Sequence, residues 1–135
     1  MLKDGFTRNF CLEGWNHRRI PVALDIEYWP MNASKSRTGR MYEIGMDGFS
    51  LCLREYLEIA HDLRISLLCD FGSEFLLVEP HVQVVWNERP LEGNCLLFHS
   101  GVKIMDISAI EHQILECFLH SFKDHIGNIN TAKRT

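Results

Sequence analysis

Hydrophobic and polar residues alternate through most of the first hundred positions, with the two-residue period that is typical of half-buried β-strands. The clearest run is 20–29, in which every second side chain is apolar: Ile20, Val22, Leu24, Ile26 and Tyr28. Shorter runs predict further strands at 40–44, 49–53, 63–71, 75–86 and 95–105. Within 75–86, Pro80 predicts a bulge or bend, because proline cannot donate to a central strand ladder.

The period changes to that of a helix near the C-terminus. Ser108 and Glu111 have the spacing of a capping box, and a wide apolar face follows on the helical wheel. That face holds Ile110, Ile114, Leu115, Phe118, Leu119, Phe122 and Ile126. Since Gly127 is a natural residue to end a helix, we predict one amphipathic helix over about 108–126 that packs on the sheet.

Six strands with short connections and one terminal helix predict a mainly β fold, a six-stranded antiparallel β-barrel with a C-terminal α-helix. A parallel β-α-β arrangement is disfavoured, because no long helices separate the strands. At 135 residues the chain has the length of one domain. We expect an N-terminal arm at 1–17, the barrel domain with its helix at 18–127, and a flexible tail at 128–135.

Composition and charge narrow the classes of function. The formal net charge is −4, which favours neither DNA nor an anionic membrane as a partner. The chain shows no signal peptide and no run of about 18 apolar residues that would span a bilayer. Its five cysteines are widely spaced and odd in number, which fits a reducing compartment. We therefore expect a cytoplasmic protein that binds neither membrane nor DNA.

The sequence contains few residue patterns that are typical of catalytic or metal-binding sites. Cys117 and His120 share a helix face, as do His112 and Glu116, but no second pair stands at zinc spacing. The chain also lacks a phosphate-binding glycine loop and a nucleophile elbow. We expect no catalytic residues, no metal and no resident cofactor, in a protein that is not an enzyme.

Three segments together resemble the PilZ domain family. They are 18–22 (RRIPV), 43–51 (EIGMDGFSL), and the pair 84–86 (VVW) and 101–104 (GVKI). The resemblance covers roughly 15–122 and implies a barrel of the split-barrel type with a C-terminal helix. It also implies binding of the bacterial second messenger cyclic di-GMP. The family does so with Arg-x-x-x-Arg ahead of the first strand and Asp/Asn-x-Ser-x-x-Gly across the next hairpin.

The match to these two motifs is partial. Arg19 stands at the second arginine and Gly48 at the final glycine. Trp15 replaces the first arginine, Glu43 replaces Asp or Asn, and Gly45 replaces the serine. Losing an arginine and a hydroxyl weakens binding by several kcal/mol, at about 1.5–3 for a charge-assisted hydrogen bond and about 1 for a neutral one.

Neighbouring groups could compensate for these losses. Arg18 is a second guanidinium, and the Trp15 indole could stack on a base. The ligand-binding candidates are Trp15, Arg18, Arg19, Glu43 and Gly48. They predict a signalling protein that binds cyclic di-GMP and so orders its N-terminal arm over the barrel.

The alternative is a degenerate PilZ module that binds no nucleotide. It would act as a protein-interaction adaptor in motility, pilus or exopolysaccharide regulation. An exposed remainder of the helix face, at Leu119 or Ile126, would then serve as the surface for an unknown protein partner or a homodimer. Trp86 is interpreted as a packed strand residue.

Overall fold

The computed structural model of the protein describes residues 19–88 and 97–134, with side chains described as far as 122. Seven strands and one helix follow one another in this part of the chain. They are β1 (Ile20–Pro30), β2 (Arg37–Ile44), β3 (Gly48–Leu53), β4 (Asp62–Asp70), β5 (Phe75–Val78), β6 (His81–Glu88), β7 (Phe98–Asp106) and α1 (Ala109–Arg134). The predicted arm at 1–17, with Trp15, and also Arg18 lie outside the described residues.

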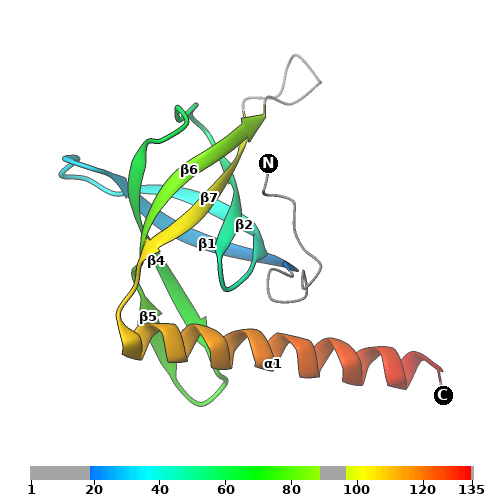
Figure 1. Ribbon diagram of the computed structural model, residues 1–135. Coiled ribbons are helices and arrows are strands. Elements are labelled where there is room, and N and C mark those ends of the chain that lie inside the picture. Colours follow the sequence, from blue (N-terminus) through cyan, green and yellow to red (C-terminus); the bar gives the residue numbers. More distant parts are fainter. Residues whose placement is uncertain (1–18, 89–96, 135) are drawn as a thin grey trace.

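Six of the strands close into an antiparallel barrel in the order β1-β2-β3-β7-β6-β4. The barrel closes because β4 also pairs with β1, for example Tyr28 with Ile65. Figure 1 shows the strands curling around one another, with α1 crossing one end of the barrel beside β5. The predicted six-stranded antiparallel barrel with a C-terminal helix is confirmed.

The additional strand arises at Pro80, which divides the predicted strand 75–86 into β5 and β6. β5 pairs with the second half of β4, Leu68 facing Leu77, and extends the sheet beyond the barrel. β6 pairs with the first residues of β4 and runs along β7. The Pro80 carbonyl accepts a hydrogen bond from the backbone N–H of Ile65 at 3.2 Å. At this position only the carbonyl of Pro80 takes part in strand pairing, so the missing N–H of proline costs no hydrogen bond.

Alternation along the strands builds one apolar core inside the barrel. Its largest fully buried side chains are Tyr28, Phe49, Met41, Ile44, Leu51, Leu53, Leu63, Ile65, Leu67, Leu115, Val78 and Val82. Val22 and Leu24, predicted on the inner face of β1, are only partly buried at the edge of this core. The register with β2 shifts between Pro21 and Leu24. Such a bulge re-aims the side chains around it.

One apolar face of α1 packs against β1, β4 and β5. Leu115 and Phe118 are buried there, as predicted. The prediction that Leu119 belongs to an exposed partner surface is wrong, because its side chain is only 8% exposed. Leu119 follows Phe118 and lies four residues after Leu115, so it falls on the face that meets the sheet. Ile110 is instead 72% exposed, and the side chain of Ile126 lies outside those described.

The helix begins as predicted but ends later. The Oγ of Ser108 accepts a hydrogen bond from the backbone N–H of Glu111 at 3.1 Å. The Glu111 carboxylate accepts from the backbone N–H of Glu79 at 3.3 Å and ties the helix to the β5–β6 link. Helical backbone continues to Arg134 rather than ending before Gly127, since one interior glycine costs a helix only about 1 kcal/mol. Within the described residues, no helix is long and apolar enough to cross a bilayer.

Candidate functional site

Arg19, the residue immediately before β1, holds the tip of the β2–β3 hairpin. Its Nε donates to Oδ1 of Asp47 at 3.3 Å, and its Nη1 donates to Oγ of Ser50 at 3.2 Å. The Ser50 hydroxyl in turn donates to Oε1 of Glu43 at 2.8 Å. One hydroxyl therefore connects the guanidinium to a carboxylate. Arg19 and the glycine hairpin, expected to form a joint site, do lie together.

Backbone contacts fix the hairpin that carries these groups. The N–H of Gly45 donates to the carbonyl of Gly48 at 3.0 Å, and the carbonyl of Asp47 accepts from Ile104 at 2.9 Å. A Cβ on Gly48 would lie 2.1 Å from the carbonyl oxygen of Val102. Gly48 is thus required by the close approach of β7, whatever it also does toward a ligand.

Ser50 was missed by the sequence analysis, which looked for a hydroxyl at position 45. In β3 the side chains of Phe49 and Leu51 point into the core, so Ser50 between them points outward. Although it lies on the outer face, Ser50 is fully buried under its neighbours. A lone serine within an apolar strand was the signal available in the sequence. The hydroxyl that contacts Arg19 therefore comes from Ser50, since Gly45 has no side chain.

A row of facing residues crosses four strands on the same outer surface. Glu43 on β2 faces Ser50 on β3, Ser50 faces Gly101 on β7, and Gly101 faces Trp86 on β6. A Cβ on Gly101 would meet the Trp86 indole at 2.0 Å, so the ring lies directly over this glycine. Trp86 keeps 38% of its surface exposed. It is packed, as interpreted from the sequence, and it also offers an aromatic surface beside the polar cluster.

An aromatic pair borders this row. The Tyr42 and His99 rings lie 5.1 Å apart, centroid to centroid, on β2 and β7. Burial raises the pKa of Tyr42, and the carboxylates of Glu43 and Glu88 raise it further. Tyr42 is therefore a neutral phenol at physiological pH and adds no negative charge to the site.

The hydrogen-bonded cluster joins one guanidinium to two carboxylates. Arg19 faces two carboxylates, Asp47 in an ion pair and Glu43 through Ser50. The side chains of Arg19 and Asp47 are 24% and 33% exposed, so solvent screens this pair and competing groups can reach it. No group of three or more potential metal ligands occurs in the described part of the chain. The cluster thus presents hydrogen-bonding groups beside the exposed part of the Trp86 ring.

The sequence by itself matches no family model and no curated protein. Solved structures share the fold. The PilZ domain of YcgR from Escherichia coli, solved with c-di-GMP, is 11% identical with a TM-score of 0.62, over 84% of this chain and 95% of that domain. The Bacillus subtilis inhibitor of motility, MotI/DgrA, is 15% identical with a TM-score of 0.65, over 78% of this chain.

A third similar structure is the PilZ domain of CeSA from a cellulose-synthesizing bacterium. It is 14% identical with a TM-score of 0.55, and the match covers 78% of this chain and 98% of that domain. The chain spans only 50% of the length of MotI. The closed barrel, the terminal helix and these three likenesses together show that the chain has a PilZ-like fold.

Proposed function

We propose that this protein is a PilZ-type signalling protein that binds cyclic di-GMP on the outer barrel surface between Arg19 and Trp86. The observation that carries the proposal is the hydrogen-bonded chain from Arg19 through Ser50 to Glu43. It joins the arginine segment to the hairpin in a fold shared with a PilZ domain solved with c-di-GMP. The proposed role is non-catalytic, cytoplasmic and without a resident cofactor.

The chemistry of this surface fits a cyclic guanine dinucleotide. The planar fork of Arg19 suits a phosphate or the O6/N7 edge of guanine. The exposed part of Trp86 offers a ring for base stacking, a contact worth about 1–3 kcal/mol per base. Glu43 carries acceptor oxygens for the N–H groups of a guanine. Arg18 and Trp15 stay candidates for added contacts from the N-terminal arm.

The ion pair between Arg19 and Asp47 must give way for Arg19 to reach a phosphate. Partly exposed pairs of this kind contribute about 0–1 kcal/mol. A charge-assisted bond to phosphate contributes about 1.5–3 kcal/mol.

Isothermal titration with cyclic di-GMP tests the proposal. Wild type is expected to bind, and Arg19→Ala is expected to bind about tenfold to a hundredfold more weakly, since each 1.4 kcal/mol is tenfold. Arg40→Ala is a matched control, because Arg40 is exposed on β2 and pairs with Asp25 at 3.2 Å. Absence of heat and of any melting-temperature shift at high micromolar ligand, with folded wild type, would refute nucleotide sensing.

The second candidate function is an adaptor that binds a protein partner and no nucleotide. It is favoured by the two carboxylates, Asp47 and Glu43, that already engage Arg19. The likeness to an inhibitor of motility fits either role. Asp47→Asn separates the two candidates, because it removes a charge that repels phosphate. A sensor then binds cyclic di-GMP as tightly or more tightly, whereas an adaptor still binds none.

A further inference from the structure

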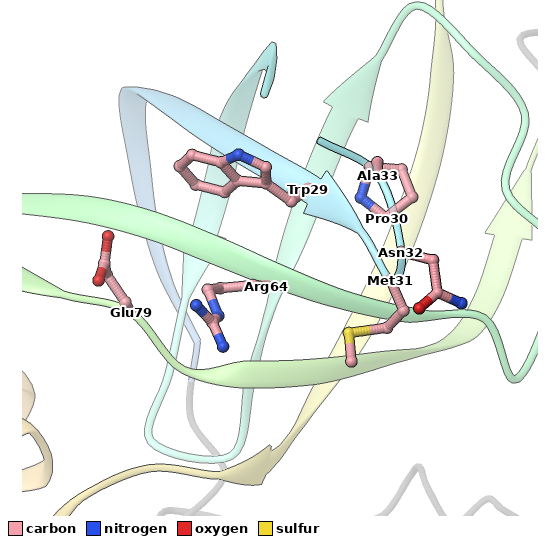
Figure 2. Close-up of a pocket in the computed structure, with 7 residues that line it drawn as sticks. All are labelled: Trp29, Pro30, Met31, Asn32, Ala33, Arg64 and Glu79. Atoms are coloured by element: carbon pink, nitrogen blue, oxygen red, sulfur yellow. The ribbon is translucent and has the colours of Figure 1, made fainter. Parts of the chain in front are cut away.

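A small pocket lies at the far end of β1 from Arg19. Its volume is about 280 Å³, and Figure 2 shows the residues that line it: Trp29, Pro30, Met31, Asn32, Ala33, Arg64 and Glu79. Trp29 lies nine residues along β1 from Ile20, which at about 3.3 Å per residue is roughly 30 Å. The pocket is therefore distinct from the surface proposed for cyclic di-GMP.

The walls of this pocket are held by backbone contacts. Trp29 on β1 faces Arg64 on β4, so both side chains project from the same face of the sheet. After β1 the chain turns sharply, with Met31 N–H donating to Asp62 at 3.1 Å and Ala33 N–H donating to Pro30 at 2.9 Å. Asn32 adopts a left-handed backbone with φ of 73°, which asparagine tolerates better than most residues. The site is therefore preformed.

Arg64 and Glu79 line the pocket but form no ion pair with each other. Among the described residues, neither Arg64 nor the Glu79 carboxylate takes part in an ion pair or side-chain hydrogen bond. Their charged atoms are thus more than 4.0 Å apart, although both border one small cavity. The Glu79 backbone is fixed by its hydrogen bond to Glu111 at 3.3 Å. Both side chains are exposed, so a guest that bridges Arg64 and Glu79 would replace their contacts with water.

We propose that this pocket binds a single guanine base, as in a guanine mononucleotide. The Trp29 indole provides a face for stacking. The Arg64 fork matches the O6 and N7 acceptors of guanine, and the Glu79 carboxylate accepts from its N2 amino group. Adenine presents an amino donor at the position of O6, where it would face the guanidinium. The pocket thus distinguishes guanine from adenine by hydrogen-bond polarity.

The size of the pocket limits the ligand to one base. Its volume of about 280 Å³ lies just below the usual range of ligand pockets, roughly 300–1,000 Å³. A whole cyclic dinucleotide exceeds this space. The inference therefore concerns a second site and stands whether or not the Arg19 surface binds cyclic di-GMP.

Tryptophan fluorescence during titration with GMP or AMP tests this inference. Stacking is expected to quench Trp29 saturably with GMP up to about 1 mM, with AMP at least about tenfold weaker. Trp29→Phe is expected to abolish the quenching, while Trp86→Phe and Arg19→Ala retain it. Glu79→Gln and Arg64→Ala are expected to weaken GMP binding at least about tenfold. Glu74→Gln, at another exposed glutamate, is the matched control for Glu79→Gln.

Three results would overturn the assignment. The first is no saturable quenching by GMP with folded wild type. The second is quenching that survives in Trp29→Phe and disappears in Trp86→Phe or Arg19→Ala, which would place the nucleotide on the other surface. The third is equal affinity for GMP and AMP, which would mean that Arg64 and Glu79 do not read the base.

Discussion

Nη1 of Arg19 donates a hydrogen bond to Oγ of Ser50 at 3.2 Å, across 31 positions of sequence. The contact joins the residue that enters the barrel to the third strand. Because the same hydroxyl donates to Glu43, it orients both an arginine and a carboxylate on one outer surface. Ser50 thus provides a hydroxyl beside a hairpin whose motif position, Gly45, has none.

Ser50→Ala is expected to destabilise the fold and disorder the site together. The change removes the Ser50 hydroxyl, which is one acceptor for Arg19 and the donor to Glu43, while Arg19 keeps its contact with Asp47. Each lost hydrogen bond contributes about 0.5–1.5 kcal/mol, so the two together predict a loss of about 1–3 kcal/mol. Urea unfolding monitored by circular dichroism measures the loss, with Ser36→Ala at an exposed position as the control. Equal stability of Ser50→Ala and wild type would contradict the hydrogen-bond chain.

Gly48→Ala is expected to destabilise the barrel through a steric clash with β7. The added Cβ would lie 2.1 Å from the carbonyl oxygen of Val102, which is backbone and cannot move alone. Overpacking of this kind costs about 1–3 kcal/mol. A lower midpoint in urea unfolding, with an unchanged m-value, is the expected signature. A midpoint equal to that of wild type would show that the strands separate at no cost.

Tyr28 is expected to make the fold sensitive to alkaline pH. Its hydroxyl donates to Glu55, which also accepts from Arg37 at 2.7 Å. Burial, followed by the hydrogen bond to Glu55, raises the pKa of Tyr28 above its usual value of 10.0. A raised pKa means that this stabilisation is complete below pH 10.0 and is lost as the pH rises toward the folded-state value.

Melting temperatures measured from neutral to strongly alkaline pH test this relationship. Tyr28→Phe is expected to melt lower than wild type at neutral pH and to lose less stability above pH 10.0. Tyr56→Phe, at a surface tyrosine, serves as the control. Parallel alkaline profiles for wild type and Tyr28→Phe would contradict the assignment.

Cys69 and Cys117 are expected to differ strongly in thiol reactivity. Cys69 is fully buried in β4, and burial raises the pKa of its thiol to about 12. Cys117 is exposed on α1. Because the thiolate is the reactive form, iodoacetamide should label Cys117 in the native protein and Cys69 only after denaturation. Peptide mass spectrometry gives the labelling at each position, and rapid native labelling of Cys69 would indicate an open barrel.

The strands could be predicted because their signal is local. Each strand of the barrel faces core on one side, so period-two alternation shows in the sequence. Pro80 predicted a bend. The division into β5 and β6 also depends on β4, which pairs with β6 through its first residues and with β5 through its last ones. Barrel closure by β4 and β1 is a long-range contact with no local pattern.

The site could be predicted only in part, for the same physical reason. Arg19, Glu43 and Gly48 were named as candidates because they stand at motif positions. Ser50 and Trp86 join them through strand pairing, and Trp86 does so across Gly101 on a neighbouring strand. The spacing of residues along the chain does not reveal which residues the register of paired strands brings together.

The central claim is that Arg19, the β2–β3 hairpin and Trp86 form one nucleotide-binding surface. Two-dimensional ¹H–¹⁵N NMR of the labelled protein during titration with cyclic di-GMP tests it most directly. The account predicts that the largest shifts fall on the backbone amides of Arg19, of 43–50 and of Gly101, and on the Trp86 indole N–H. Shifts confined to α1 or the β4–β5 hairpin, or no shifts at saturating ligand, would contradict it.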